Sequence, residues 1–384
     1  MPPANAPPGA APPAAETAAA PAGPTAMTTP AMAGPLAANP DPIHFDAVPA
    51  GTVYMTGALS GLLLTQTDPI LGDRSTTVDL SNAQVTLQNT DGWFQFFLEP
   101  GAYSLPTLGT SYKAFSVGPA TNLYGGLPVA WGKIVPTDTF SIQGGQLPTL
   151  IGAEGMFTFQ NMNIERGLLW AQEPVVSHGV QANLTTGPVA WSASVNDGYY
   201  SGQYNWLTGS ATWTIDPANT LVISGGGAIG RNTAPGTFAT PVAQNNSQIV
   251  EAGYTYGNAP WTITPYVQYT HVGADSRLGI VNDSSTIGAA VLANYKFTDT
   301  ISLAGRFEYI DSSGAATGAG LLGYGPGSSA MSFTLTPTWQ SGIYFVRGEG
   351  SYVSLSHTAP GFAFGNGGNS KSQGRFMLET GIVF

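Results

Sequence analysis

Apolar and polar residues alternate along several stretches of this chain with the two-residue period of a β-strand. Residues 261–270 carry Trp, Ile, Pro, Val and Tyr at the odd positions and mainly Thr and Gln at the even ones. Residues 287–297 and 331–339 repeat this pattern. Because successive side chains of a strand point to opposite faces, each stretch predicts a strand with one apolar face and one polar face.

The last strand that the pattern predicts ends the chain on Phe384. Its even positions from 376 onward hold Phe, Leu, Thr, Ile and Phe, whereas its odd positions include Arg375 and Glu379. A strand with a lipid-compatible face, a charged face and a terminal aromatic residue is typical of the closing strand of an outer-membrane β-barrel. We therefore expect Phe384 to be an assembly signal read by the outer-membrane assembly machinery and an anchor at the membrane interface.

Short turns and long loops alternate between the predicted strands. The seven short turns lie at residues 89–91, 136–138, 186–187, 216–219, 257–260, 298–300 and 340–342. The eight longer loops, rich in Gly, Ser and Asn, lie near residues 67–74, 104–126, 147–174, 198–207, 230–246, 273–284, 312–328 and 355–372. This pattern predicts an all-β, transmembrane antiparallel β-barrel of about 16 strands, with both termini on the short-turn side. Counts of 14 and 18 remain as alternatives, because residues 75–145 alternate weakly.

Aromatic residues gather beside the short turns, as in the interface girdle of a membrane barrel. They are Trp93, Trp213, Trp261, Phe297, Trp339 and Phe384. Charged residues make up only 9% of the chain, against roughly 25% in soluble domains. Even so, no apolar run approaches the roughly 20 residues of a membrane helix. A barrel accounts for both observations, because its apolar residues are spread over alternate positions.

Composition excludes several functions. The formal net charge of −11 argues against nucleic-acid binding, which needs a basic patch. The chain has no cysteine, and its four histidines show no metal-ligand spacing, so we expect neither a metal nor a cofactor. Residues 225–230 match GxGxxG, but Pro235 follows too soon for a helix. No Ser, His and Asp spacing around Asp197 supports a catalytic triad, and we expect no enzyme activity.

Residues 1–48 are rich in Ala and Pro and predict a disordered tail, which leaves residues 49–384 as the barrel. The first basic residue is Arg74, so the charged and apolar regions of a signal peptide are missing. We expect that a signal peptide has been removed from an exported chain and that Met1 was added or mis-assigned. A passive tail is favoured over one that reaches peptidoglycan or binds a partner.

Charged residues of the C-terminal strands fall on the face opposite the apolar one. Arginine facing lipid at mid-depth costs about 2–4 kcal/mol, so these residues are expected to face a watery lumen. A barrel of about 16 strands encloses an aqueous channel. Residues 147–175, the long stretch with helical character, are expected to fold into it as a partly helical constriction, an outer lid being the alternative. The residues expected at the constriction or in the lumen are Glu154, Glu165, Arg166, Glu173, Glu251, Lys296, Arg306, Glu308, Arg347, Glu349, Arg375 and Glu379.

Residues 130–200 resemble the putative β-barrel porin-2 family of bacterial outer membranes. The residues that carry the resemblance are Gly132-Lys133, Gly152-Ala153-Glu154, residues 161–169, Pro174, His178-Gly179-Val180 and Asn196-Asp197-Gly198. The rest of the barrel is similar only in its hairpins and terminal Phe, and the Ala/Pro tail lies outside the resemblance. The resemblance implies a pore and names no substrate.

The sequence thus predicts an outer-membrane porin that contacts membrane lipid and passes small hydrophilic solutes or ions by passive diffusion. The lumen charges either form a salt-bridge network that supports the wall or shape the field felt by a solute. Net acidity weakly favours cations. The sequence leaves open whether the protein is a monomer or a trimer. One alternative is a non-conducting surface barrel whose loops 312–328 and 355–372 bind a partner; another is a soluble secreted β-protein such as a lectin or solenoid.

Overall fold

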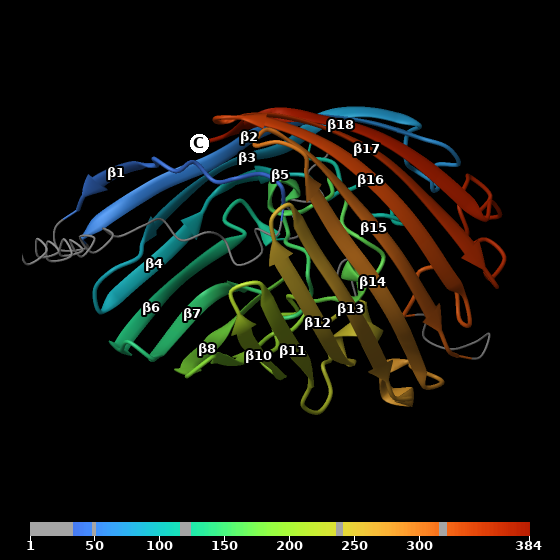
Figure 1. The fold of residues 1–384 in the computed structure, drawn as a ribbon. Coiled ribbons are helices and arrows are strands. Elements are labelled where there is room, and N and C mark those ends of the chain that lie inside the picture. The colour runs from blue at the N-terminus through green and yellow to red at the C-terminus, as the bar shows by residue number, and fades with distance from the viewer. Residues whose placement is uncertain (1–33, 48–50, 116–123, 236–240, 315–320) are drawn as a thin grey trace, which may run out of the picture.

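The alternating strands close into one antiparallel barrel (Figure 1). The computed structural model describes residues 34–47, 51–115, 124–235, 241–314 and 321–384. Strand β18 (Ser372–Val383) pairs with β2 (Thr52–Gln66) and so closes the wall. The other strands are β1 (Ile43–Asp46), β3 (Thr76–Asn89), β4 (Phe94–Glu99), β5 (Gly101–Tyr103), β6 (Val129–Thr137), β7 (Phe140–Pro148), β8 (Val176–Thr186), β9 (Val189–Asn196), β10 (Trp206–Asp216), β11 (Asn219–Ala228), β12 (Gln248–Asn258), β13 (Trp261–Val272), β14 (Ser284–Lys296), β15 (Ile301–Ser312), β16 (Ser329–Ser341) and β17 (Tyr344–Ser356).

The barrel wall has sixteen strand positions, as the sequence predicts. The sheet contains eighteen strands, but β4 and β5 share one position because both pair with β3. Pro100, which has no N–H to donate, separates these two strands. Strand β1 pairs with the same edge of β2 as β18, beyond the end of β18, and so adds no position, so that sixteen remain.

The predicted turns are also confirmed. Strand β8 ends at Thr186 and β9 begins at Val189, and β16 ends at Ser341 and β17 begins at Tyr344. The other five short connections join the pairs β3–β4, β6–β7, β10–β11, β12–β13 and β14–β15. The long loops all lie at the opposite end of the barrel, which is the arrangement of an outer-membrane protein.

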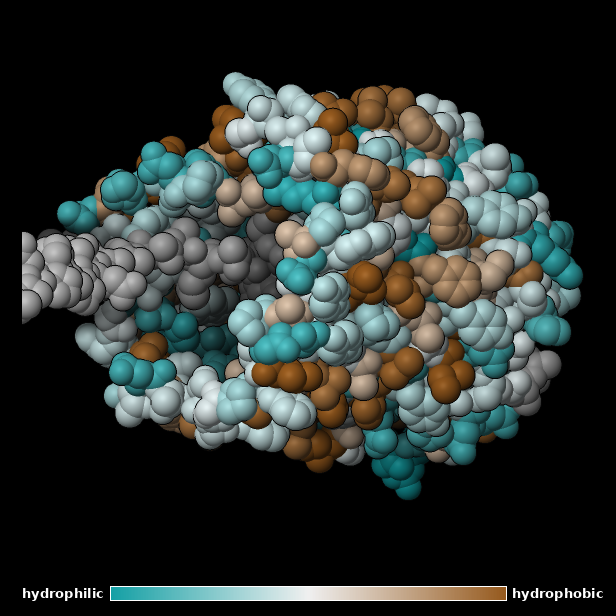
Figure 2. Space-filling view, in the orientation of Figure 1, coloured by the Kyte–Doolittle hydropathy of each residue, from teal (hydrophilic) through white to brown (hydrophobic). Residues whose placement is uncertain are grey.

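The two faces of the wall differ as the alternation predicts. Phe307 and Phe333 are about half exposed on the outer face, whereas the neighbouring Arg306 is 1% exposed. Figure 2 shows hydrophobic side chains spread over the outer surface of the strands. Trp93, Trp213, Trp261, Phe297 and Trp339 are exposed, as a lipid-facing girdle requires.

Phe384 completes the closing strand. Its backbone N–H donates to the Gly57 carbonyl at 2.9 Å, and the Gly57 N–H donates to the Phe384 carbonyl at 2.8 Å. The Phe384 ring lies over Gly57, where an added Cβ would approach its Cζ to 2.6 Å. Gly57 therefore leaves the space that the terminal ring occupies.

Residues 34–47 differ from the expected disordered tail. Strand β1 pairs with residues 52–55 of β2, on the edge of β2 that extends past Phe384. Pairing satisfies backbone groups that a free edge would leave open. Residues 1–33 and 48–50, the rest of the expected tail, lie outside the described residues.

The loop between β7 and β8 contains little helix, although its sequence suggested more. Its regular structure is two 3₁₀ turns, η1 (Thr158–Gln160) and η2 (Trp170–Gln172). Two further short helices, α2 (Val242–Asn245) and η3 (Ser276–Leu278), lie in outer loops. Among the described residues, no helix has the length and apolar character needed to cross a membrane.

Candidate pore and its inward loop

The loop between β7 and β8, residues 149–175, packs against the inner face of the barrel. Arg306 of β15 makes the first contact: its Nη1 lies 2.5 Å from Glu154 Oε1 of the loop. The Arg306 Nε lies 3.2 Å from Glu308 Oε2 on the same strand. All three side chains are at most 1% exposed. The loop therefore neutralises a buried arginine of the wall.

Arg347 of β17 forms the second contact. Its Nη2 lies 2.5 Å from Glu379 Oε2 of β18, and the same guanidinium donates to the carbonyl oxygens of Thr158 and Asn161. The Thr158 hydroxyl in turn donates to Glu379 Oε1 at 2.5 Å. Charge-assisted bonds from one planar guanidinium to a carboxylate and two carbonyls fix both distance and orientation.

The third contact involves Arg375 of β18, whose Nη1 lies 2.7 Å from Glu165 Oε1 of the loop. The same guanidinium donates to the carbonyl oxygens of Thr107 and Thr110, and thereby binds the loop after β5 as well. Nearby, Glu349 of β17 accepts the backbone N–H groups of Ile164 (2.5 Å) and Glu165 (3.0 Å). The ion pairs of the loop thus all lie on one side of the barrel, from β15 to β18, whereas its apolar residues also pack in a cluster with Phe97 of β4 and Trp131 of β6.

Four of the predicted charges lie outside these pairs or only at their margin. Arg166 is fully buried, its guanidinium has no hydrogen-bond partner in the described part of the chain, and it lies 5.1 Å from the Trp170 ring. Burial lowers the pKa of Arg166 to about 10, with Glu154 and Glu165 opposing this, so the side chain stays cationic at neutral pH. Glu173 of the loop and Glu251 of β12 are both buried. Lys296 lies at the short-turn end, half exposed and 3.8 Å from Asp299.

The opposite side of the barrel, from β6 to β11, is not covered in this way. Toward the short-turn end its inward-facing side chains are neutral and half-buried, for example Gln143, Asn183, Ser192 and Thr212, whereas Trp206 near the long loops is buried. Lys133 of β6 adds a positive charge there and lies 5.5 Å from the Trp131 ring. The sequence signal of this wall is the alternation of Ser, Thr and Asn on these strands, which the charged residues of β15 to β18 do not reveal.

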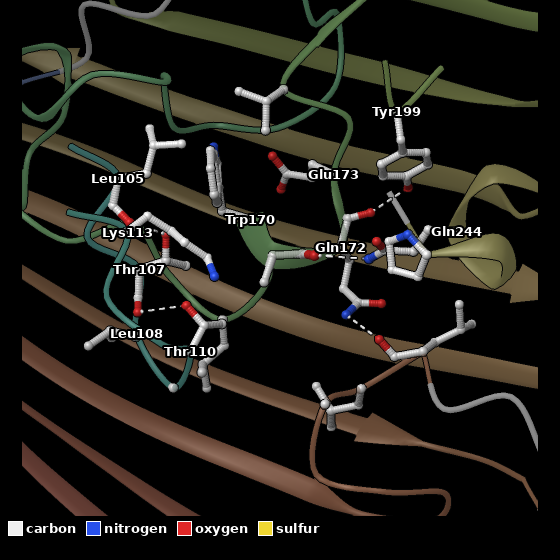
Figure 3. Close-up of a pocket in the computed structure, with 18 of the residues that line it drawn as sticks. Leu105, Thr107, Leu108, Thr110, Lys113, Trp170, Gln172, Glu173, Tyr199 and Gln244 are labelled. Carbon is white, nitrogen blue, oxygen red and sulfur yellow. Dashed lines mark hydrogen bonds between the residues drawn. The ribbon is translucent and has the colours of Figure 1, made fainter. Parts of the chain in front are cut away.

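A pocket of about 460 Å³ opens among the long loops (Figure 3). Trp170, Gln172 and Glu173 of the inward loop form one part of its lining, and Lys113 of the loop after β5 forms another. The remaining lining comes from the loops around α2 and residues 321–324. Gln172 and Gln244 use their amide nitrogens to bind backbone carbonyls, so they hold the loops together.

The segment before β1 lies in the mouth at the short-turn end. Leu36 is 3% exposed, and the backbone of Ala37 exchanges two hydrogen bonds with the Gln340 amide, at 2.8 and 3.0 Å. A Cβ added to Gly34 would lie 2.5 Å from the Asn161 carbonyl oxygen, so this segment reaches the inward loop. A cavity of about 400 Å³ remains between it and the ends of β14, β15 and β16.

The conspicuous His178 and Asp197 form a structural pair. His178 Nδ1 lies 2.9 Å from Asp197 Oδ2, and the same carboxylate accepts backbone N–H groups of His178 and Gly202. The Ser201 hydroxyl donates to the Asp197 carbonyl, which is not the geometry of a triad. The described residues also contain no group of acidic or histidine side chains that could hold a metal ion.

A closed wall of strands with an apolar outer face and a polar interior defines an outer-membrane β-barrel. The chain belongs to the family described as "Putative beta-barrel porin-2, OmpL-like", whose model matches residues 52–384. It is accordingly a porin of the bacterial outer membrane. No curated protein sequence matches it.

Solved structures share the fold at low sequence identity. The outer membrane channel DcaP of Acinetobacter baumannii is 11% identical, with a TM-score of 0.58 over 88% of this chain and 99% of that chain. Outer-membrane expressed OmpT of Vibrio cholerae is 13% identical, with a TM-score of 0.55 over 90% of this chain and 100% of that chain. A trimer form of OmpT from Vibrio cholerae, folded in vitro, is 12% identical, with a TM-score of 0.55 over 86% and 99%.

Proposed function

We propose that small hydrophilic solutes and ions diffuse through this barrel between the inward loop and the wall formed by β6 to β11. One observation carries the proposal: the loop is bound by buried ion pairs to β15–β18, whereas polar side chains of the facing wall are half-buried. A loop whose ion pairs all lie on one side of a wide barrel would narrow the barrel and leave a path along the polar wall. We infer that the protein is a channel without enzymatic activity.

Under this proposal the charges of β15, β17 and β18 support the loop and do not meet the solute. Arg306, Arg347 and Arg375 are buried, and each is already paired with a glutamate of the loop or the wall, so their charges are not left for a passing ion. Of the two roles open from the sequence, support of the wall fits this burial. Glu173 and Lys113, which line the outer pocket, and Lys133 of β6 then remain to act on a solute.

We further propose that residues 34–40 form a second restriction, at the short-turn mouth. The hydrogen bonds between Ala37 and Gln340 and the burial of Leu36 support this role. The solute would therefore pass two narrow points in series, one formed by the inward loop and one by the N-terminal segment.

Single-channel recording of the purified protein in a planar bilayer tests the channel. We expect discrete conductance steps in KCl, and a larger step after deletion of residues 155–170, because the deletion removes the material between the walls. Deletion of the exposed Asn366 and Gly367 in another outer loop serves as the control and should leave the step size unchanged. A folded protein with no steps would favour the non-conducting surface barrel, and an unchanged step after the first deletion would remove the loop from the path.

A further inference from the structure

The outer pocket combines one acidic side, one basic side and an aromatic surface. In Figure 3 the Trp170 indole lies between the ammonium group of Lys113 and the carboxylate of Glu173. Tyr124 and Tyr199 add aromatic surface to the lining. With about 460 Å³, the pocket has room for a molecule of amino-acid size.

The acidic side lacks a compensating cation. Glu173 is 3% exposed, and neither of its carboxylate oxygens has a hydrogen-bond partner among the described residues. Behind it, on β12 and β13, Glu251 Oε2, Gln268 Oε1 and the Tyr266 hydroxyl are also buried without a partner. Glu251 and Gln268 face each other across the two strands. A buried group of oxygens without a donor is costly and calls for a donor from outside the chain.

The described residues of the chain do not supply that donor. Arg306, the nearby wall arginine, already lies within ion-pair distance of Glu154 and Glu308. Arg166 lies 5.1 Å from the Trp170 ring, and its guanidinium makes no hydrogen bond to Glu173 or to any other described residue. An ammonium group with three N–H donors would suit the free oxygens of Glu173.

We propose that this pocket is a binding site for small zwitterionic solutes that carry both an ammonium and a carboxylate group, such as α-amino acids. The ammonium group binds Glu173, the apolar side chain packs on Trp170, and the carboxylate group binds Lys113. The inference rests on the proposed channel function, because the solute reaches the pocket on its way into the lumen.

The charges of Glu173 and Lys113 favour zwitterions over other classes of solute. A neutral sugar would stack on Trp170 but leave the Glu173 carboxylate without a counter-charge. A simple anion would suit Lys113 and would be repelled by Glu173 and Glu251. A simple amine would suit Glu173 and leave the contact with Lys113 unused. A zwitterion alone uses all three elements of the lining.

Transient block of the single-channel current tests the site, with the full chain and solutes added on the long-loop side. Phenylalanine, phenethylamine and 3-phenylpropionate share one phenethyl body and differ in charge. We expect phenylalanine to block with an affinity about tenfold higher than either singly charged analogue, because each analogue loses one charge-assisted contact. Equal block by all three solutes, or block by none of them, would overturn the proposal.

Two substitutions test which side chain of the pocket contacts each charged group of the solute. Glu173→Gln should remove the preference for phenylalanine over 3-phenylpropionate, and Lys113→Gln should remove the preference over phenethylamine. Lys371→Gln, the same chemical change on an exposed residue of another outer loop, is the matched control and should change neither preference. Unchanged preferences in both pocket variants would overturn the assignment.

Different observations test the channel proposal and the binding-site proposal. Conductance steps in KCl, recorded before any solute is added, report on the channel alone. Normal steps without selective block would contradict the binding site and leave the channel intact. Absence of steps would contradict the channel itself. If one variant does not fold, as judged by heat-modifiable gel mobility, the comparison of the three solutes on the unmodified protein still decides the matter.

Discussion

At the residue scale, the interior of this barrel is organised by arginine side chains that each hold a separate part of the inward loop. Arg347 has its charge matched by Glu379 and its remaining N–H groups taken by the carbonyls of Thr158 and Asn161. Such a pair is weak evidence for high stability, because both charges lose their water. Its value lies in orientation, since few other side chains could bind two loop carbonyls and a carboxylate together.

Removal of one partner of this pair should therefore lower the stability of the barrel far more than removal of both partners. We expect Arg347→Met to cost about 3–5 kcal/mol, because it leaves the Glu379 carboxylate buried without a counter-charge. The double variant Arg347→Met, Glu379→Gln should recover a large part of this loss. The measurement is the temperature at which folded gel mobility is lost in detergent, with Lys371→Gln as the control. A single variant as stable as the parent protein would contradict the prediction.

The carboxyl group of Glu173 gives the pocket a pH dependence. Burial, followed by the nearby carboxylates of Glu251, Glu154 and Glu308, raises the pKa of Glu173 well above its ordinary value. An ammonium group binds the ionised form only, so affinity should rise as pH rises through this raised pKa. Block by phenylalanine should accordingly continue to strengthen with rising pH beyond the range in which an ordinary glutamate becomes ionised. Glu173→Gln should show a flat profile, and a flat profile in the parent protein would refute this link.

At the scale of elements, the strands could be predicted and the inward loop only in part. Alternation and turn length determine the strands, because a lipid face and a water face impose a period of two along each one. The loop has a helical sequence but only two 3₁₀ turns, and the wall explains why. Glu349 accepts the N–H groups of Ile164 and Glu165, and Glu308 accepts that of Leu169 at 3.2 Å. These are donors that a helix would have used internally.

The wall from β6 to β11 should determine ion selectivity. Lys133 is the one Lys or Arg within these strands, all of which are described, and it faces the path proposed for ions. Replacement by glutamate reverses a charge in that path, so Lys133→Glu should shift the reversal potential in a KCl gradient toward cations. Lys133→Gln should shift it less. Lys371→Glu, the same charge reversal on an exposed residue of an outer loop, is the control. A shift toward chloride in Lys133→Glu would place the path elsewhere.

At the scale of the whole molecule, the sequence predicts the closed wall, the compartment and the side on which the termini lie. It does not predict which distant charges meet. Arg306 and Glu154 are 152 residues apart, and Arg375 and Glu165 are 210 apart, so only the closed barrel brings them together. The segment from Gly34 to Pro40 was also missed, because Ala and Pro carry no periodic signal. Its contacts are backbone hydrogen bonds and one buried leucine, Leu36, which composition cannot distinguish from a tail.

This N-terminal segment provides the last test. Deletion of residues 2–40 retains β1 and removes the chain that lies between Asn161 and the ends of β14 to β16. The short-turn mouth then widens, and the single-channel conductance in KCl should increase. Deletion of residues 2–33 is the matched control, because it leaves Gly34, Leu36 and Ala37 in place, and its conductance should remain that of the parent. Gln340→Ala removes both hydrogen bonds to Ala37 and should give an intermediate, noisier current. Equal conductance in the two deletions would show that the segment is no restriction and would leave the inward loop as the single narrow point.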